Sequence, residues 1–357
     1  MSEDEYYEDD FEDDVVTPPP TPPMPVAAVA AAVGVTPIGI GSGFSHEDVS
    51  PTAEHSPVSH VPWSVITLDE LELHDKLAAG AMGTITGGYY RGKPVAVKTL
   101  HDRSPEALAS VEAELLVHAS LKHPCIVELI GANLVTGPGC CIVMERCECS
   151  LFEQLHRRSN ELSRRELMRL AIQIAEGMLH LHTRRPPVVH RDLKSHNVLL
   201  DTNGSAKLCD FGLVNTREVT AGTPNYMAPE LFLSKPNSSS VDVFAFGVLL
   251  NEMWAREVPW DGYLPFDIKE KVVAGERPPT PKAMPLQCES LLKKLWHKSS
   301  SLRPTFAEAI PLLESVLTNL PAGAPPSRGG GGFGGGMPVD SLDALDSMMD
   351  LSLRPRR

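Results

Sequence analysis

Residues His190 to Asn197 read HRDLKSHN and contain the most informative motif of the chain. It brings an acid, Asp192, a base, Lys194, and the amide of Asn197 within a few positions of one another, directly after an apolar pair. Two further motifs follow along the chain: DFG at residues 210–212 and APE at residues 228–230. These polar side chains are the candidates for the chemistry of the chain.

In this order, the three motifs resemble the catalytic loop, the metal loop and the activation-segment end of a eukaryotic protein kinase. The resemblance extends from about Leu68 to Leu320, and the sequence is most similar to the tyrosine-kinase-like, Raf-related serine/threonine group. It implies an α+β fold with two lobes. The N-lobe would be a five-stranded antiparallel sheet with one helix, the family's helix C, and the C-lobe would be mainly helical.

Charge is distributed unevenly along the 357 residues. The chain has a formal net charge of −14, and residues 1–65 contain twelve acids with no lysine or arginine. The kinase-like region is nearly neutral, so the acidic character belongs to the N-terminal segment. This balance argues against binding to nucleic acid or to an anionic membrane surface.

Cysteine usage and the N-terminus indicate the compartment. Seven cysteines in a chain of this length do not suggest a disulfide framework, and the acidic start is the opposite of a basic signal-peptide start. The apolar run at residues 26–33 is too short to span a bilayer. We therefore expect no membrane span and a reducing compartment, either the cytoplasm alone or the cytoplasm together with the nucleus.

We expect three parts in the chain. Residues 1–62 form a disordered acidic, proline- and alanine-rich tail, because such a composition cannot bury enough apolar surface to offset its ordering entropy. Residues 63–320 form the kinase domain, with the N-lobe at about 63–145 and the C-lobe at about 146–320. Residues 321–357 form a glycine-rich linker and a short amphipathic tail.

Each tail contains a candidate segment for binding a partner. Pro18–Pro23 is either a polyproline ligand for SH3 or WW domains or a plain spacer. Between Asp340 and Leu353, leucines and methionines lie near helical spacing among aspartates. This second segment is either a helix that docks in a partner's groove or a disordered end.

Periodicity and turn signals predict the elements of the domain. Ser104 followed by Pro105 is a helix start signal, and Arg91–Lys93 is a turn between two strands. The expected elements are strands at Leu68–Ala78, Thr84–Tyr90, Pro94–Leu100, Ile126–Ile130 and Cys140–Met144, and helices at Ser104–Leu121 and Ser163–Thr183.

A glycine-containing loop lies between the first two expected strands. The family pattern is G-x-G-x-x-G, and here Ala78 takes the place of the first glycine while Gly80 and Gly83 match the others. Glycine lets backbone amides approach the ATP phosphates because no Cβ stands in the way. The resemblance therefore implies a nucleotide-binding loop that Ala78 weakens without abolishing its function.

Lys98 ends an apolar strand and matches the lysine that clamps the ATP phosphates in the family. In the family this lysine pairs with a helix glutamate, for which Glu114 has the right spacing, whereas the rival Glu112 lies on another helical face. His118, one turn later, departs from the usual leucine or methionine. It is either a neutral, hydrogen-bonded histidine or a residue that loosens the active arrangement, since burying its charged form is costly.

Residues 141–147 resemble the crossing between the lobes where adenine binds. Met144 falls at the family's gatekeeper position, and backbone groups of Glu145 and Cys147 would pair with the adenine edge. The resemblance also assigns nucleotide contacts to Ile85, Ala96 and Leu199. Cys147 and Cys149 form a C-x-C pair, but no second pair follows at suitable spacing, so ordinary thiols are favoured over a metal site.

The resemblance assigns roles in phosphoryl transfer to the polar residues of the motifs. Asp192 orients the acceptor hydroxyl and takes its proton, and Lys194 neutralises charge on the transferred phosphate. Asn197 and Asp210 supply oxygen ligands to Mg²⁺, which prefers such hard ligands together with the phosphates of ATP. The expected cofactors are therefore ATP and Mg²⁺.

The activation segment contains three threonines of interest. Thr223 matches the residue that contacts the catalytic aspartate and lysine in serine/threonine kinases. Thr220 is our candidate phosphorylation site, with Thr216 as the runner-up and ordinary loop threonines as the alternative. The candidate rests on Arg191, which precedes the catalytic aspartate in kinases that are switched on by a phosphate in this segment.

Two buried contacts of the family are expected in the C-lobe. Asp242 would accept backbone amides of the catalytic loop, which is a structural role. Arg303 matches the arginine that pairs with Glu230 of the APE motif.

Taken as a whole, the motifs predict an ATP- and Mg²⁺-dependent kinase that phosphorylates serine or threonine of proteins in signal transduction. Lys194 and Thr223 disfavour a tyrosine kinase. The alternative is a kinase-fold scaffold, a pseudokinase that binds partners under the control of nucleotide, and Ala78 and His118 favour it.

Overall fold

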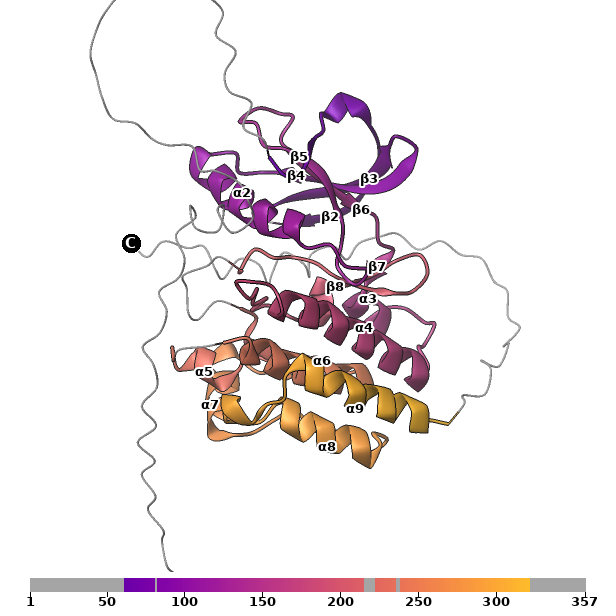
Figure 1. Ribbon diagram of the computed structural model, residues 1–357, viewed down its shortest axis with the longest axis vertical. Helices are drawn as coiled ribbons and strands as arrows, with labels where there is room; N and C mark the ends of the chain where they lie inside the picture. Colours follow the sequence, from indigo (N-terminus) through magenta and orange to yellow (C-terminus); the bar gives the residue numbers. More distant parts are fainter. Residues whose placement is uncertain (1–60, 81, 215–221, 236–237, 322–357) are drawn as a thin grey trace, which may run out of the picture.

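The computed structural model describes residues 61–80, 82–214, 222–235 and 238–321. A β-sheet lobe lies above a helical lobe in Figure 1, and the chain crosses between them after Glu145. The described part of the chain therefore has the two-lobed α+β fold that the sequence predicts.

The small lobe is built, within the described residues, on a six-stranded sheet with the order β1-β5-β6-β4-β3-β2. Its strands are β1 (Ser64–Val65), β2 (Leu71–Gly80), β3 (Gly83–Tyr90), β4 (Lys93–Leu100), β5 (Leu129–Asn133) and β6 (Cys141–Glu145). The five longer strands pair antiparallel as predicted. The two-residue β1, which was not predicted, pairs in parallel with β5 at the edge.

Two predicted strand starts are wrong by a few residues. The strand expected from Ile126 begins at Leu129, because the backbone on either side of Ile126 is already bonded to Leu208 in the large lobe, at 2.8 and 2.9 Å. The strand expected from Leu68 begins at Leu71, because Leu68–Glu70 forms a 3-10 turn closed by a capping box.

The two faces of the sheet have different partners. Val95 and Val97 of β4 are fully buried on one face. Helix α2 (Pro105–Ser120) covers the other face, where its apolar residues pack against Leu100 and Ile142. As predicted, α2 begins after Ser104, whose hydroxyl accepts a hydrogen bond from the third residue along.

The large lobe is mainly helical, as expected. Its helices are α3 (Leu151–His156), α4 (Arg164–His182), α5 (Pro229–Phe232), α6 (Ser240–Ala255), α7 (Pro265–Ala274), α8 (Leu286–Leu295) and α9 (Phe306–Asn319). A small sheet is formed by β7 (Cys149–Ser150), β8 (Val198–Leu200) and β9 (Ala206–Leu208). The described part of this lobe also contains the 3-10 turns η2 (Ser195–Asn197), η3 (Pro224–Tyr226) and η4 (Ser300–Leu302).

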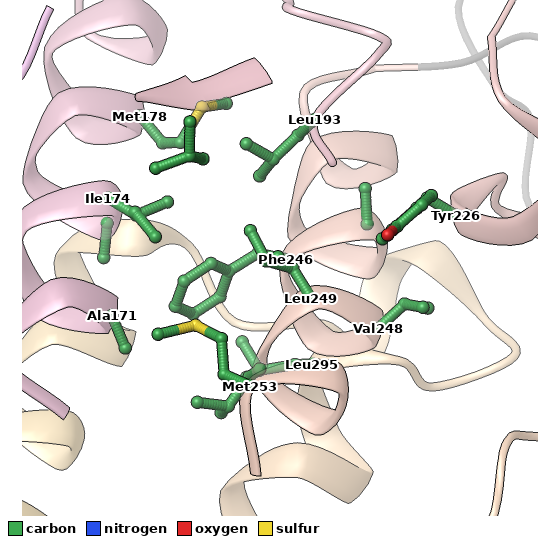
Figure 2. Close-up of a cluster of buried hydrophobic side chains, with 14 of the residues drawn as sticks. Ala171, Ile174, Met178, Leu193, Tyr226, Phe246, Val248, Leu249, Met253 and Leu295 are labelled. Carbon is green, nitrogen blue, oxygen red and sulfur yellow. The ribbon is translucent and has the colours of Figure 1, made fainter. Parts of the chain in front are cut away.

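Helix α6 is the centre of this lobe, because every residue from Val241 to Trp254 is buried. Figure 2 shows its Phe246 and Leu249 together with Ile174 of α4 and Leu193 of the HRDLKSHN segment in one apolar cluster. The catalytic-loop candidate is therefore anchored on the core of the large lobe. No helix among the described residues is long and apolar enough to span a bilayer.

Candidate active site

The HRDLKSHN segment is held at its start by the buried carboxylate of Asp242 in α6. Its two oxygens accept hydrogen bonds from the backbone N–H groups of His190 and Arg191, both at 2.8 Å. Arg191 has a φ of 67°, a conformation that is costly for a residue with a Cβ. The predicted role of Asp242 is confirmed, and its two bonds hold the backbone in this conformation.

Asp192 lies at the centre of a compact set of polar contacts. Its Oδ1 accepts hydrogen bonds from the hydroxyl of Thr223 at 2.7 Å and from the Thr223 backbone N–H at 3.0 Å. The Lys194 ammonium lies 2.8 Å from Asp192 Oδ2 and donates to the Thr223 hydroxyl at 2.8 Å. The expected contact of Thr223 with both charged residues is confirmed.

Asn197 completes this set from the turn η2. Its Nδ2 donates to the backbone oxygen of Asp192 at 2.8 Å and to Asp192 Oδ2 at 3.1 Å. This orientation turns the amide oxygen Oδ1 of Asn197 away from Asp192. The predicted role of this amide oxygen as a Mg²⁺ ligand stays a prediction.

The DFG motif follows β9 and places its aspartate in an unusual backbone conformation. Asp210 has a φ of 66°, and the ring of the next residue, Phe211, is buried. The Phe211 ring lies between two histidine rings, with its centroid 5.0 Å from His118 and 5.5 Å from His190. His118 therefore packs on the metal loop, as the sequence predicts.

His118 is buried and hydrogen-bonded in this structure. Its Nε2 donates to the backbone oxygen of Val127 at 2.6 Å. Burial lowers the pKa of His118 below its ordinary value, with a smaller opposing effect of the Val127 carbonyl. These contacts agree with the neutral-histidine interpretation, while an effect of His118 on activity stays a prediction.

The residues predicted to contact nucleotide share one face of the sheet. Strand pairing sets Lys98 opposite Ile85, and Ala96 opposite Met144, so these four side chains lie on the same side. Helix α2 covers this side, which brings Glu114 toward Lys98. Leu199 lies apart from them on β8 in the large lobe.

The expected ion pair between Lys98 and Glu114 is not present among the described residues. Burial, together with the neighbouring carboxylate of Asp210, raises the pKa of Glu114 to about 7. Lys98 and the backbone N–H of Phe211 lower this pKa, but by less than burial and Asp210 raise it. Glu114 is thus near Lys98, its predicted partner, and near Asp210, whereas Glu112 is exposed on another face of α2.

The glycine loop connects β2 to β3, and its members differ in their surroundings. Ala78 pairs with Ile85 within β2, directly after a register shift between Lys76 and Ala78, so the strand accommodates its Cβ. A Cβ on Gly83 would lie 2.4 Å from the backbone oxygen of Thr99, so packing of the sheet already requires glycine there. A Cβ on Gly80 would meet nothing within 4 Å, which leaves open space beside this residue.

The crossing between the lobes is fastened by Glu145. Its backbone N–H donates to the Glu128 oxygen at 3.0 Å, and its carboxylate accepts the Glu128 N–H at 2.8 Å. The same carboxylate pairs with Lys207 of β9 at 2.9 Å, a contact between lobes that the sequence did not predict. Burial raises the pKa of Cys147 to about 12. Among the described residues, no three or more His, Cys, Asp or Glu side chains are grouped so that they could hold a metal ion by themselves.

The APE motif is anchored as predicted. Arg303 contacts both oxygens of the Glu230 carboxylate, at 2.5 and 2.9 Å, and both side chains are buried. The candidate phosphorylation sites Thr220 and Thr216 lie outside the described residues. So do residues 1–60, with the Pro18–Pro23 segment, and residues 322–357.

Comparison with known proteins identifies the family. The model of the protein tyrosine and serine/threonine kinase family matches residues 71–313, about two thirds of the chain. The chain therefore belongs to the protein kinase family, and the matches agree with the predicted Raf-related, tyrosine-kinase-like group.

Several curated proteins are similar to the chain. It is 36% identical over 262 residues to a probable serine/threonine-protein kinase of Dictyostelium discoideum, covering 70% of this chain and 28% of the relative. It is 34% identical over 281 residues to the serine/threonine-protein kinase CTR1 of Arabidopsis thaliana, covering 75% and 33%. The probable serine/threonine-protein kinase SIS8 of the same plant is 32% identical over 303 residues, covering 80% and 29%. The match thus spans about a third or less of each of these relatives.

Proposed function

We propose that this chain is an ATP- and Mg²⁺-dependent kinase that phosphorylates serine or threonine residues of protein substrates in signal transduction. The observation that carries the proposal is the convergence of Asp192, Lys194 and Thr223, joined by hydrogen bonds of 2.7 to 2.8 Å. The similar proteins above, which are named as serine/threonine-protein kinases, support the same acceptor class.

Each of the converging residues has a distinct task in this proposal. The Asp192 carboxylate orients the acceptor hydroxyl and accepts its proton. The Lys194 ammonium is held by its hydrogen bond to the Thr223 hydroxyl. It offsets the negative charge that develops as phosphate is transferred. Catalysis in this reaction is mostly positioning and charge neutralisation, and the geometry supports both.

The residues present fit Mg²⁺ and ATP. Asn197 and Asp210 offer hard oxygen donors, and the open space beside Gly80 suits the approach of phosphate to backbone amides. Two protein oxygens are too few for a Mg²⁺ site by themselves, so the phosphates of ATP would complete the coordination shell. Bound ATP supplies the phosphoryl group, and Lys98, Ile85, Ala96, Met144, Leu199 and the backbone at Glu145 and Cys147 would hold it.

The proposal is tested by phosphate transfer from labelled ATP and Mg²⁺ to a mixture of serine, threonine and tyrosine peptides. Asp192→Ala removes the carboxylate, and Asp261→Ala is the matched control because it removes an exposed carboxylate of the same lobe. We expect label on serine or threonine with the parent chain and the control, but none with Asp192→Ala. Label that persists in Asp192→Ala, or that appears chiefly on tyrosine, would contradict the proposal.

A second candidate, a kinase-fold scaffold controlled by nucleotide, is favoured by one observation. Lys98 and Glu114 form no ion pair among the described residues, and burial favours the uncharged form of the Glu114 carboxyl. Binding of ATP without transfer to any acceptor, even after treatment with an activating kinase, would support the scaffold. Transfer by the untreated chain would exclude it.

The remaining assignments are also proposals. We infer a kinase domain at residues 63–320, with residues 1–62 and 321–357 as tails, and a location in the cytoplasm, with or without the nucleus. Pro18–Pro23 is proposed as a ligand for SH3 or WW domains and the C-terminal tail as a docking segment. Pull-down with isolated SH3 and WW domains, with all prolines of Pro18–Pro23 replaced by alanine as the control, tests the first of these contacts.

A further inference from the structure

Helix α6 contains a second buried carboxylate, Glu252, for which the motifs of the chain give no role. Its exposed fraction is 0%, like that of Asp242 on the same helix. Burying an ionised carboxylate costs several kcal/mol unless hydrogen bonds replace its water shell. The partners of Glu252 therefore show what this position is for.

Three donors from three different segments converge on Glu252. Ser195 donates its hydroxyl to Oε1 at 2.7 Å, and Tyr226 donates its hydroxyl to Oε2 at 2.7 Å. The ring nitrogen Nε2 of His156 lies 3.0 Å from Oε1. Burial, together with the Glu252 charge, raises the pKa of Tyr226 well above its ordinary value, so the phenol stays protonated and remains a donor.

The Ser195 contact fixes the end of the catalytic loop. Ser195 lies between Lys194 and Asn197 and is completely buried. The turn that contains it is closed by a hydrogen bond from the Asn197 N–H to the Lys194 oxygen at 3.0 Å. A displacement of Ser195 would therefore move the two polar residues on either side of it.

The Tyr226 contact fixes the turn on the acceptor side. The N–H of Tyr226 donates to the backbone oxygen of Thr223 at 3.0 Å, which closes the turn η3 directly after Thr223. Thr223 is the residue that donates to Asp192. Figure 2 shows Tyr226 at the edge of the apolar cluster around α6. Packing against this cluster holds the Tyr226 ring in place.

We propose that Glu252 is a positioning residue for phosphoryl transfer, which keeps Asp192, Lys194 and Thr223 in register by binding Ser195 and Tyr226 at once. Asp242 holds the catalytic loop at its start, and Glu252, from the same helix, holds it at its end. The inference rests on the proposed kinase activity of this chain.

The third partner extends this connection toward the crossing between the lobes. His156 ends α3, the helix that follows the crossing segment and β7. Its side chain is 11% exposed, so the contact with Glu252 lies near the surface while the two hydroxyl contacts are interior. Glu252 is thus tied to α3, to the catalytic loop and to the turn that follows Thr223.

The test compares Glu252→Gln, Ser195→Ala and Tyr226→Phe with the parent chain in the peptide assay. The glutamine keeps the volume but offers one acceptor oxygen instead of two, so one hydroxyl loses its partner. We expect Glu252→Gln to lower kcat about tenfold or more, with the KM for ATP unchanged within about twofold. Ser195→Ala and Tyr226→Phe should lower kcat less, and their effects should not multiply in the double variant.

Asn251→Ala is the matched control, because Asn251 is the buried neighbour of Glu252 on α6 and bonds only to the Pro279 oxygen among the described contacts, at 3.2 Å. It should lower the unfolding temperature without lowering the kcat of the folded fraction. A kcat for Glu252→Gln within about twofold of the parent, or a loss equal to that of Asn251→Ala, would overturn the proposal.

Amide hydrogen exchange separates this proposal from the proposed activity. Glu252→Gln should speed exchange at the N–H groups of Asn197, Thr223 and Tyr226, and Asn251→Ala should not. A parent chain without transferase activity refutes the proposed function, whatever the exchange shows. Unchanged exchange at the three amides in Glu252→Gln refutes the positioning role, whatever the activity, and Tyr226→Phe provides the same measurement if Glu252→Gln does not fold.

Discussion

The hydroxyl of Thr223 donates a 2.7 Å hydrogen bond to Oδ1 of Asp192, although the two residues are 31 positions apart in the chain. The Thr223 hydroxyl has one hydrogen, and because it is given to Asp192, the same oxygen can accept from Lys194 at 2.8 Å. Asp192, which is proposed to take the proton of the substrate hydroxyl, and Thr223 are therefore held together before any substrate binds.

Removal of the Thr223 hydroxyl should lower the rate of transfer. Thr223→Ala takes away the bond to Asp192 Oδ1 and the acceptor of the Lys194 bond, so both charged groups lose a support. We expect kcat to fall about tenfold to a hundredfold in the peptide assay. Thr223→Ser keeps the hydroxyl and should retain most of the rate, and equal rates for the alanine and serine variants would contradict this role.

Removal of Mg²⁺ should weaken nucleotide binding through Asp210. Chelation should raise the dissociation constant of ATP for the parent chain about tenfold or more, since the phosphates lose the ion that joins them to protein oxygens. Asp210→Asn should bind ATP weakly whether or not Mg²⁺ is present, as measured by calorimetry. The assignment is wrong if Asp210→Asn keeps the full response to chelation that the Asp261→Asn control shows.

Loss of the buried pair between Arg303 and Glu230 should destabilise the large lobe. Arg303→Ala leaves a buried carboxylate without its cation, which costs about 3–5 kcal/mol of unfolding free energy. The exposed pair of Lys293 with Glu289 is the control, because Lys293→Ala should cost less than about 1 kcal/mol. Urea unfolding measures both, and similar costs for the two variants would disprove the claim.

His118 should make stability depend on pH in one direction. Its pKa is lowered from 6.5 in the folded chain by burial, so below pH 6.5 the unfolded chain binds more protons. Its contribution to stability is thus lost as pH falls from 6.5 toward the lowered pKa, and it does not change at higher pH.

The variant His118→Leu separates the two interpretations of this residue. It should be less stable at about pH 7.5, because the Val127 oxygen loses its donor, yet lose less stability on acidification to about pH 5. If the histidine also loosens the active arrangement, the leucine variant should have higher basal activity. Unchanged basal activity and an unchanged pH profile would refute that hypothesis.

Motif spacing was sufficient to predict contacts between residues of the same short segment. The grouping of Asp192, Lys194 and Asn197 follows from a turn within one segment, and the start of α2 follows from Ser104 and Pro105. The family resemblance added the long-range contacts of Asp242, Thr223 and Glu230, which the structure confirms.

Other features could not be predicted, because they depend on how separate elements pack. The segment around Ile126 has the apolar pattern of a strand, but its backbone bonds to the other lobe. The ion pair expected between Lys98 and Glu114 is absent among the described residues, and burial together with Asp210 raises the pKa of the Glu114 carboxyl. No motif or spacing in the sequence indicated that the carboxylate of Glu145 would bind Lys207.

Motif order and apolar periodicity can be recognised in the amino-acid sequence, and they were enough to predict the family, the two-lobed fold and the identity of the polar residues. The contacts that hold those residues in place depend on how distant segments pack, so they became visible in the folded chain. Glu252 lies in an apolar helix, and no local pattern connects it to Ser195 or Tyr226. A carboxylate becomes an anchor only where folding removes its water and brings donors from distant segments to replace it.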